Sequence, residues 1–367
     1  MKQPLRVLHF QGRMGKGGAE TFMMNAYRNI DRTKIQFDFL IYEDFEDVKP
    51  YNKEIHELGG KIYSVPNPNK NILGYIQGVK KLLKDKHFDI VHNEVFFGGG
   101  LNLWLAKQAG ISKRVAHSHA TTDGKGNNFV MVTIRNIFRR MLLKNATDYL
   151  ACSYEAGIGL YGEDHPFVFV PNGIDLGSYE NIPQSKEEIR NELNIPQNAL
   201  VIGNIGRFEE QKNHDVLINI FEEIVKKRPN SHLILIGEGS LEDRIKNKVI
   251  KLDLQSKVSF LGLRDDIPQL LKAMDVFLMP SLYEGLPISA VEAQAAGLKI
   301  VLSTKVSKET ALSENVFFIS LEETPGKWAE KVIEKPFENN PTEALFLYDM
   351  KKTAAQLEKM YLKIRRK

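Results

Sequence analysis

Two glutamates in the C-terminal third of the chain have a spacing that could bind a phosphate and neighbouring hydroxyl groups. Glu284 follows the apolar strand Asp275–Met279 in a turn, and Glu292 comes eight positions later inside an expected helix, Pro287–Ala296. A helix N-terminus carries partial positive charge and unpaired N–H groups that suit an anion. A carboxylate beside it could accept hydrogen bonds from the hydroxyls of a sugar or ribose. Glutamates at this spacing are also common on solvated helix faces, so spacing alone leaves both interpretations open.

Two cations form a second candidate pair further upstream. Arg207 and Lys212 lie in the segment Gly206–Asn213, directly after the expected strand Val201–Ile205. A guanidinium and an ammonium a few residues apart can together clamp a diphosphate. The alternative is two exposed cations in an ordinary loop. The position after a strand, with the glutamates downstream, favours the clamp.

A glycine-rich segment near the N-terminus could bring backbone amides close to a ligand. Gly12–Gly18 (GRMGKGG) separates the expected strand Arg6–Gln11 from the expected helix Ala19–Asn29. Glycine permits such an approach because it has no side chain. The segment has neither the G-x-G-x-x-G pattern of dinucleotide-binding folds nor the G-x-x-x-x-G-K-[ST] pattern of a Walker loop. A tight strand-to-helix turn is the alternative.

Two histidines stand at the end of another expected strand, Arg114–Thr121. His117 and His119 are two residues apart, so both point to the same side if the strand continues through them. Ligands of parallel sheets bind at the carboxyl ends of strands. A metal site would need more ligands, and no further ligand cluster appears nearby in the sequence. A buried histidine is more often simply hydrogen-bonded.

The elements that must position these residues alternate regularly between strand and helix. Such alternation predicts an α/β fold with parallel sheets covered by helices on both faces. With 367 residues, the chain is long enough for two domains. The turn-forming segment Asn339–Pro341 precedes an expected long helix, Thr342–Arg365.

Composition limits the functional classes and the compartment. Lys and Arg number 50 against 46 Asp and Glu, a mildly basic balance that does not indicate nucleic acid binding but permits contact with anionic lipid or phosphate groups. A single cysteine, Cys152, allows no disulfide within the chain and fits a reducing cytoplasm. The chain starts without an apolar signal segment, and no apolar run could span a bilayer. A cytoplasmic protein, soluble or peripheral to the membrane, is therefore expected.

One segment has the character of a membrane-surface helix. Gly126–Ala146 interleaves four basic residues with large apolar ones. A basic, apolar helix of this kind can lie on an anionic membrane. The alternative is an ordinary core helix with a solvated basic edge.

The motifs together resemble the family-4 glycosyltransferases of GT-B architecture. The family signature E-G-[FL]-P, followed by E-A-x-A-x-G, stands here as Glu284 to Pro287 and Glu292 to Gly297. One departure is Leu298-Lys299, where the family usually has Pro-Val. Further matches follow the family's order: GGAE at Gly17–Glu20, PNGxD at Pro171–Asp175, G-R-x-x-x-x-K-[NG] at Gly206–Asn213 and G-x-G at Gly237–Gly239.

The resemblance implies an α/β GT-B fold: two Rossmann-like domains with parallel sheets that face a central cleft, and a C-terminal helix that crosses back to the first domain. The implied domains are residues 1–171, on the acceptor side, together with the helix 342–367, and residues 172–341, which bind the nucleotide-sugar. The implied reaction moves a sugar from a nucleotide-sugar, with a UDP-sugar as the expected donor, to an acceptor hydroxyl with retention of anomeric configuration. The opening of the chain is similar to bacterial exopolysaccharide and capsule glycosyltransferases, so a glycan acceptor linked to lipid is expected. No metal is expected to be required, and the chain has no D-x-D triplet.

Residue roles carry over from the family position by position. Glu292 should hold ribose hydroxyls, Glu284 should hold hydroxyls of the transferred sugar, and Arg207 and Lys212 should neutralise the diphosphate. His119, with His117 as second choice, should touch the sugar. The remaining donor-binding positions implied by the resemblance are Gly17, Gly18, Gly237, Gly239, Leu263, Gly285 and Leu286.

Two other functions remain open on the sequence. One is a nucleotide-sugar epimerase on a similar two-domain scaffold, which would interconvert free donors without an acceptor. The other is a non-catalytic binding subunit that keeps the fold, against which the intact set of cations and glutamates argues.

Overall fold

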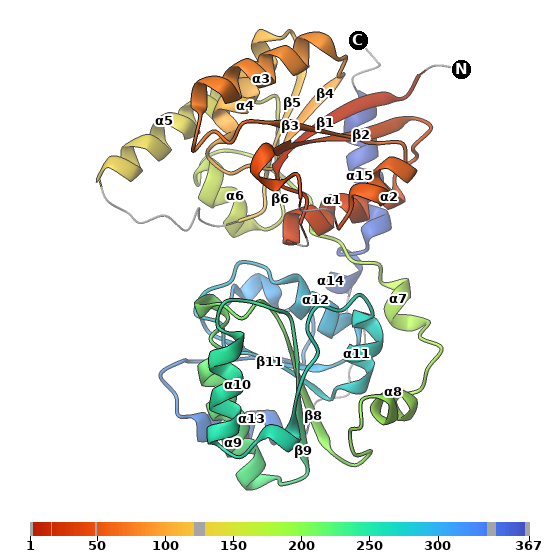
Figure 1. Ribbon diagram of the computed structural model, residues 1–367, viewed down its shortest axis with the longest axis vertical. Helices are drawn as coiled ribbons and strands as arrows, with labels where there is room; N and C mark the ends of the chain where they lie inside the picture. Colours follow the sequence, from red (N-terminus) through yellow and green to blue (C-terminus); the bar gives the residue numbers. More distant parts are fainter. Residues whose placement is uncertain (1–2, 16, 48–49, 121–128, 336–342, 364–367) are drawn as a thin grey trace. The chain divides into compact units, whose positions relative to one another are not determined.

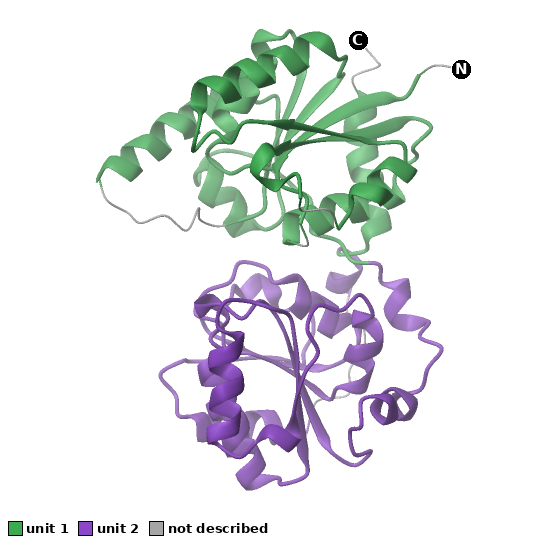
Figure 2. Ribbon diagram, viewed as in Figure 1, with its two compact units in different colours: residues 1–174, 348–367 green, residues 175–347 purple. Residues whose placement is uncertain are grey.

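The chain forms two compact units, coloured separately in Figure 2. Unit 1 comprises residues 1–174 and 348–367, and unit 2 comprises residues 175–347. Both expected domain boundaries, after residues 171 and 341, lie a few residues before these divisions. The computed structural model describes residues 3–15, 17–47, 50–120, 129–335 and 343–363.

Unit 1 is built on a seven-stranded parallel sheet with the strand order β3-β2-β1-β4-β5-β6-β7. Its strands are β1 (Leu5–Gly12), β2 (Ile35–Tyr42), β3 (Lys61–Val65), β4 (Ile90–Asn93), β5 (Lys113–Ser118), β6 (Asp148–Ala151) and β7 (Val168–Phe169). Its helices are α1 (Gly18–Asn29), η1 (Glu43–Phe45), α2 (Asn52–Glu57), α3 (Ile72–Asp85), α4 (Gly99–Gln108), α5 (Phe129–Asn145), α6 (Tyr154–Tyr161) and α15 (Met350–Leu362). Every pairing in the sheet is parallel, as the alternation predicted.

Helices cover both faces of this sheet (Figure 1). Side chains of α1, α2 and α15 share one core with β1 and β2, and side chains of α3, α4 and α6 share the other with β4 and β5. The alternation of apolar and polar residues in Ile35–Ile41 predicts a strand that is covered on one face only, but β2 is buried on both faces. Asp38, which its alternation would place in solvent, is buried because it forms an ion pair with Arg6 and accepts a hydrogen bond from the N–H of Lys61.

Unit 2 contains a six-stranded parallel sheet with the order β10-β9-β8-β11-β12-β13. Its strands are β8 (Leu200–Ile205), β9 (Ser231–Ile236), β10 (Val258–Phe260), β11 (Val276–Met279), β12 (Lys299–Ser303) and β13 (Val316–Ile319). Its helices are α7 (Gly177–Glu180), α8 (Lys186–Glu192), η2 (Glu210–Lys212), α9 (His214–Lys227), α10 (Glu242–Lys251), η3 (Gln255–Lys257), α11 (Ile267–Ala273), α12 (Ile288–Ala295), η4 (Lys308–Thr310), α13 (Pro325–Ile333) and α14 (Glu343–Phe346). One face of this sheet packs against α9, α10 and α13, and the other face packs against α11 and α12.

Local sequence signals explain where the helices of unit 2 begin and end. Ser185 and Glu188 form a reciprocal capping box that starts α8. Gly297 ends the turn after α12 with φ of 77°, a conformation that glycine adopts without steric cost. Pro287 was expected in the first helical turn but is the N-cap, because its ψ of 117° keeps it extended before Ile288.

The C-terminal segment is not the single helix expected over 342–365. α14 ends at Phe346 and α15 begins at Met350, while residues 342, 364 and 365 lie outside the described residues. The break has a physical cause: the N–H of Ile174 donates to the carbonyl of Tyr348, and the N–H of Met350 donates to the carbonyl of Ile174. α15 then packs on α1 in unit 1, so the C-terminal helix does return to the first domain as predicted.

Candidate functional site

The predicted donor site in unit 2 lies at the carboxyl ends of neighbouring strands. β8 pairs with β9 on one side and with β11 on the other, so the loops that follow these three strands meet at one edge of the sheet. The N–H of Gly206 donates to Ile236 and that of Phe208 donates to Glu238, at 2.9 and 3.0 Å. The loop after β8 therefore runs alongside the loop after β9.

Hydrogen bonds also join the loop after β8 to the loop after β11. The N–H of Leu282 donates to the carbonyl of Gln211 at 2.8 Å, and the Asn213 amide donates to the carbonyl of Pro280 at 3.0 Å. This places Lys212 beside Glu284, with 2.5 Å between Nζ and Oε1. The two side chains are only 15% and 11% exposed, so the structure brings together one predicted cation and one predicted carboxylate in a partly shielded pair.

Backbone hydrogen bonds from the segment after β12 hold Glu284 in place. Its N–H donates to the carbonyl of Lys305 at 3.2 Å, and its carbonyl accepts from the N–H of Ser307 at 3.1 Å. Both partners lie in the segment after β12. These two backbone hydrogen bonds therefore fix the turn that carries Glu284. They also fix the position from which its carboxylate can reach a ligand.

Glycines allow these loops to pack at this density. A side chain on Gly206 would meet the Lys212 stem at 3.0 Å, and one on Gly239 would meet the carbonyl of Phe208 at 2.5 Å. Gly237 has φ of 137°, and a side chain there would overlap the carbonyl oxygen of Gly206. Gly237 also donates its N–H to Gly262 at 2.9 Å. Side chains are thus excluded along the loop edge, and backbone groups are left near the surface.

Glu292 occupies a second position near the same edge, inside α12. Its Oε1 accepts a hydrogen bond from the hydroxyl of Tyr179 at 3.0 Å. Burial raises the pKa of Glu292 to about 7, opposed by this hydrogen bond. The carboxyl group is therefore near half-ionised at neutral pH, and within the described part of unit 2 its second oxygen is left for a ligand hydroxyl.

The other predicted donor-binding residues of unit 2 are placed around this edge with little contact among themselves. Arg207 is exposed, and its side chain is not joined to Lys212 or either glutamate. Leu263 is 54% exposed after β10, and Gly285 and Leu286 are half-buried next to Glu284. The structure thus brings Lys212 to Glu284 and leaves Arg207 extended into solvent.

In the glycine-rich turn of unit 1, Gly17 and Gly18 differ in the space that is available for a side chain. A side chain on Gly17 would collide with the carboxylate of Glu20, which is itself paired with Arg13 at 3.1 Å. A side chain on Gly18 would meet none of the described residues within 4 Å. Gly18 therefore offers its backbone to open space at the N-terminus of α1 (Gly18–Asn29), as the interpretation as a ligand-facing turn requires.

His119 lies just beyond β5 with both ring nitrogens engaged. Its Nε2 is 2.6 Å from Oε2 of Glu94, and its Nδ1 is 3.1 Å from Oδ1 of Asn172. Burial opposes the charged form, but contacts with Cys152 and Glu94 outweigh it and raise the pKa of His119 to about 10. Burial likewise acts to raise the pKa of Glu94, but the surrounding imidazoles lower it well below its ordinary value.

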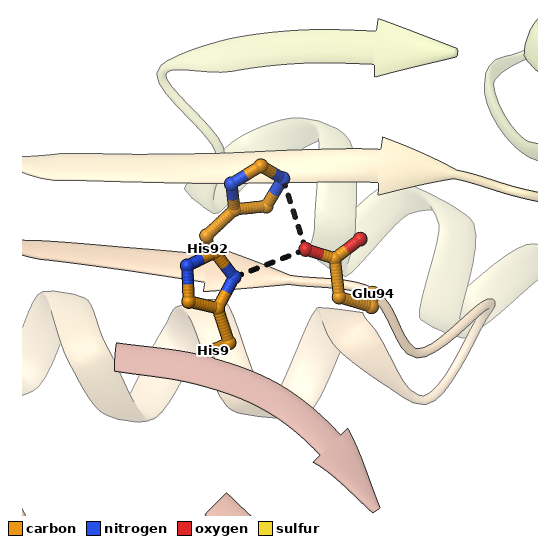
Figure 3. A group of neighbouring side chains, drawn as sticks. All are labelled: His9, His92 and Glu94. Atoms are coloured by element: carbon orange, nitrogen blue, oxygen red, sulfur yellow. Dashed lines mark hydrogen bonds and ion pairs between the residues drawn. The ribbon is translucent and has the colours of Figure 1, made fainter. Parts of the chain in front are cut away.

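Three more histidines surround the same carboxylate. Figure 3 shows the rings of His9 and His92, on β1 and β4, turned towards Oε1 of Glu94 at 3.2 Å each. Nδ1 of His117 lies 3.2 Å from Nε2 of His92. Burial lowers the pKa of all three histidines, that of His92 to about 3. We expected no further metal-ligating residues near His117 and His119. This expectation is wrong, because β1, β4 and β5 are consecutive in the sheet and bring His9, His92 and Glu94 close to these two histidines.

Sequence reasoning did not single out Glu94, His9, His92 or Tyr179. A signal for the first three was present: His92 and Glu94 stand at the carboxyl end of β4, and His9 stands in the neighbouring strand β1 beside His92. Only the strand order shows that they meet. Tyr179 gave no signal, because it lies in α7 within the polar segment Leu176–Gln184, which matches none of the motifs.

One helix of unit 1 carries an exposed apolar surface. α5 projects beyond the rest of the unit in Figure 1, and within it only Leu142 and Asn145 are buried. We call its exposed large side chains the α5 apolar face: Phe129, Val130, Val132, Ile134 and Ile137. Exposure reaches 86% at Phe129, which does not fit an ordinary core helix. Residues 126–128 of the predicted segment lie outside the described residues. Among those described, no helix has the length and apolar character needed to cross a bilayer.

Solved structures with this fold define the class. HepE from Anabaena, crystallised with UDP, covers 99% of both chains with a TM-score of 0.74 at 20% identity. Sucrose-phosphate synthase from Thermosynechococcus elongatus also covers 99% of both chains, with a TM-score of 0.73 at 16% identity. The chain has the fold of the GT-B glycosyltransferases.

Sequence relatives give the family. Residues 16–178 match the model described as Glycosyltransferase Family 4, and residues 185–335 match Glycosyl transferases group 1. The putative glycosyltransferase EpsF of Bacillus subtilis is 36% identical over 96% of this chain and 92% of that protein. A UDP-Gal:alpha-D-GlcNAc-diphosphoundecaprenol alpha-1,3-galactosyltransferase of Escherichia coli is 30% identical over 82% of each chain. The capsular polysaccharide biosynthesis glycosyltransferase CapH of Staphylococcus aureus is 25% identical over 98% of this chain and 99% of that protein. The chain belongs to the family-4 glycosyltransferases and is an enzyme that transfers glycosyl groups.

Proposed function

We propose that this glycosyltransferase moves a sugar from a UDP-sugar to a hydroxyl group of a lipid-linked glycan, in exopolysaccharide or capsule synthesis, with retention of anomeric configuration. The observation that carries the proposal is the Lys212–Glu284 contact of 2.5 Å at the carboxyl edge of the unit 2 sheet. The relatives support the donor and the acceptor class, since the Escherichia coli galactosyltransferase acts on a diphosphoundecaprenol-linked sugar with UDP-Gal and CapH serves capsule synthesis.

Lys212 and Arg207 are assigned to the diphosphate of the donor. In the free enzyme Lys212 is paired with Glu284, so the ammonium is already oriented at low entropic cost. When the diphosphate arrives, the ammonium turns to it and releases the carboxylate for the hydroxyls of the transferred sugar. Arg207 is exposed and can close on the phosphates with a planar pair of donors.

Glu292 and the loop backbone are assigned to the nucleoside. The ionised carboxylate of Glu292 accepts hydrogen bonds from the ribose hydroxyls while Tyr179 occupies its Oε1. The tight turns at Gly237 and Gly239 let backbone amides approach the nucleotide, and Leu263, Gly285 and Leu286 contribute backbone contacts.

The chemistry asked of these residues is charge stabilisation. The bond from the anomeric carbon to the UDP oxygen breaks, a bond to the acceptor oxygen forms, and the acceptor's hydroxyl proton passes to an oxygen of the departing diphosphate. That leaving group gains negative charge, which two fixed cations stabilise more in the transition state than in the ground state. The cations can do this without a divalent metal, and none is proposed to be required.

The residues of unit 1 are assigned to the transferred sugar and the acceptor. Gly17 and Gly18 contribute the turn at the start of α1, and His119, rather than the fully buried His117, contacts the sugar. The α5 apolar face, with the exposed Arg140 and Lys144 on the same helix, is proposed to rest on anionic lipid at the cytoplasmic side of the membrane, where a lipid-linked acceptor resides.

A transfer assay tests the proposal. The purified enzyme is incubated with a panel of radiolabelled UDP-sugars and bacterial membranes, with and without EDTA. We expect label to enter the lipid-extractable fraction from at least one donor, unaffected by EDTA, and the new linkage to keep the anomeric configuration of the donor by NMR. Label that appears only in an epimerised free nucleotide-sugar, or in no product with any donor, would contradict the proposal.

A further inference from the structure

The hydrogen-bond partners of His119 determine its protonation state. Nε2 faces a carboxylate oxygen of Glu94 at 2.6 Å, and Nδ1 faces the side-chain oxygen of Asn172 at 3.1 Å. An ionised carboxylate and an amide oxygen can only accept hydrogen bonds, so both nitrogens of His119 must carry a hydrogen. The ring is therefore an imidazolium, and its side chain is only 7% exposed.

The carboxylate of Glu94 is held by neutral imidazoles on its other oxygen. Its side chain is fully buried. Nε2 of His92 faces the acceptor Oε1 of Glu94 at 3.2 Å, which places the hydrogen of His92 on Nε2 and leaves Nδ1 to accept from the hydroxyl of Tyr361, on α15, at 2.5 Å. His9 approaches the same oxygen with Nδ1 at 3.2 Å. A buried charge held by several donors stays ionised and fixed in place.

A bound metal ion is the rival explanation for this cluster. Two groups have ligand atoms close enough for a cation: His9, His92 and Glu94, and Glu94, His117 and His119. The charges argue against it, because a divalent ion bound by ionised Glu94 and neutral histidines would leave a net charge of about +1 in a buried site, whereas Glu94 and a protonated His119 neutralise each other. The nitrogen of His92 that would bind the ion also carries a hydrogen. A network of protons accounts for the contacts without a metal.

We propose that Glu94 is a positioning residue for the transfer reaction: it holds His119 as a doubly protonated cation at the carboxyl edge of the unit 1 sheet, where the donor sugar replaces Asn172 on Nδ1. The short bond to Glu94 stays in place, while the longer bond to a neutral amide is the one that a sugar oxygen can exchange. The charge of His119 then offsets negative charge that develops on the donor. This inference rests on the proposed function.

Few other groups face His119. His117 stacks against it with ring centroids 4.0 Å apart, and Phe22 of α1 packs on it at 5.2 Å. Within the described part of the chain, Cys152, after β6, and the buried His92 are the other titratable groups near it. The pKa of His119, raised to about 10, therefore depends on Glu94 and Cys152, and Glu94 is the carboxylate in direct contact with it.

The first test needs no substrate. The full chain is labelled at the Cε1 carbons of histidine, and each ring is titrated by NMR from pH 5.5 to 10, with His119→Gln to assign the signal. We expect His119 to stay protonated up to about pH 9 in the wild type and to lose about a hundredfold in proton affinity in Glu94→Gln, which keeps the size but removes the charge. A wild-type His119 that titrates near pH 6.5 would overturn the proposal whether or not the variant folds.

The second test is kinetic. In the wild type we expect kcat to be flat between pH 6 and 9. In Glu94→Gln, a hundredfold loss of proton affinity leaves about a tenth of the His119 rings protonated at pH 9, so we expect kcat to fall by about tenfold there and to recover at pH 6, where His119 is protonated again. A loss that is equal at all pH values would mark a merely structural role and contradict the proposal.

A double-mutant cycle provides the control. In a chain that already carries His119→Gln, the further change Glu94→Gln should lower kcat only slightly, because Glu94 acts through His119. The Tm of each variant is measured alongside. Stoichiometric zinc in the purified wild-type protein would also contradict the proposal. If no donor is ever turned over, the proposed function fails while the NMR titration still decides the state of His119.

Discussion

At the scale of single residues, the contact that matters most for the proposed chemistry is the pair formed by Lys212 and Glu284. The two come from loops that are 72 positions apart in the chain, yet Nζ and Oε1 lie 2.5 Å from each other. The pair is partly shielded from water, so each group is oriented before a ligand arrives. Once the ammonium has turned from Glu284 to the bound diphosphate, it needs no further reorganisation when charge develops on the leaving group.

Removing the ammonium should therefore weaken binding of the diphosphate specifically. For Lys212→Ala we expect the Kd for UDP to rise by about tenfold to a hundredfold, the range for a lost charge-assisted hydrogen bond. Isothermal titration calorimetry at fixed salt measures it. Lys227→Ala is the matched control, because it breaks the surface ion pair with Glu330 and leaves the loop edge intact. Equal effects of the two substitutions would contradict the assignment.

Glu292 should make donor binding depend on pH near neutrality. Burial raises its pKa to about 7, so the carboxylate that accepts ribose hydroxyls is lost as the pH falls through this value. We expect the affinity of the wild type for UDP to drop between pH 8 and pH 6, and that of Glu292→Gln to be weaker at pH 8 but nearly independent of pH over this range.

The same shift predicts an opposite effect on stability. Because the folded pKa is above the ordinary value of 4.5, the stability that this group contributes is present below that value and is lost as the pH rises through about 7. Glu292→Gln should therefore raise the free energy of unfolding at pH 8, by about 1–3 kcal/mol, measured by urea denaturation. A variant that is less stable at pH 8 would show that burial of Glu292 carries no such cost.

At the scale of elements, short-range signals predicted most strands and helices, and long-range contacts account for the exceptions. The bounds expected for β8, β11 and α1 differ from the structure by only one residue each, because apolar periodicity and terminal residues act locally. The prediction of one continuous C-terminal helix was wrong because the backbones of Tyr348 and Met350 hydrogen-bond to that of Ile174. No local sequence pattern reveals this long-range contact. The cluster around Glu94 was missed for the same reason, since it requires β1, β4 and β5 to be neighbours.

The loop after β9 should tolerate no side chain at Gly237. A methyl group there would overlap the carbonyl oxygen of Gly206, and φ of 137° is strained for any other residue. For Gly237→Ala we expect a loss of about 1–3 kcal/mol in unfolding free energy, with loss of UDP binding, by denaturation and calorimetry. Gly110→Ala is the control that distinguishes backbone strain from steric overlap. Gly110 has φ of 82° with open space around it, so its substitution should leave UDP binding unchanged.

α5 should bind anionic membranes through its apolar face. We expect the wild type to sediment with vesicles that contain phosphatidylglycerol and not with vesicles of phosphatidylcholine alone. A variant with Phe129, Ile134 and Ile137 changed to Ser should lose most of this binding at unchanged Tm. Substituting the exposed Leu73 and Ile250 on other helices by Ser is the control. Binding that survives in the triple variant would exclude α5 as the contact.

At the scale of the whole molecule, the chain consists of two parallel α/β units, each with its candidate residues at the carboxyl edge of its own sheet. Unit 2 holds the cations and glutamates assigned to the nucleotide-sugar, and unit 1 holds the glycine turn and His119. Membership of the family-4 glycosyltransferases rests on a relative that aligns along nearly the whole chain. The assignment of donor chemistry to unit 2 is the claim on which the remaining proposals depend.

A thermal-shift titration with UDP, UDP-sugars, GDP and ADP tests that claim most directly, because a ligand that binds only the folded state raises the Tm according to its concentration relative to Kd. We predict a concentration-dependent rise with UDP or a UDP-sugar in the wild type, and its loss in a chain that combines Lys212→Ala with Glu292→Ala. A wild type whose Tm responds to none of these nucleotides, or a double variant that responds as strongly as the wild type, would contradict it.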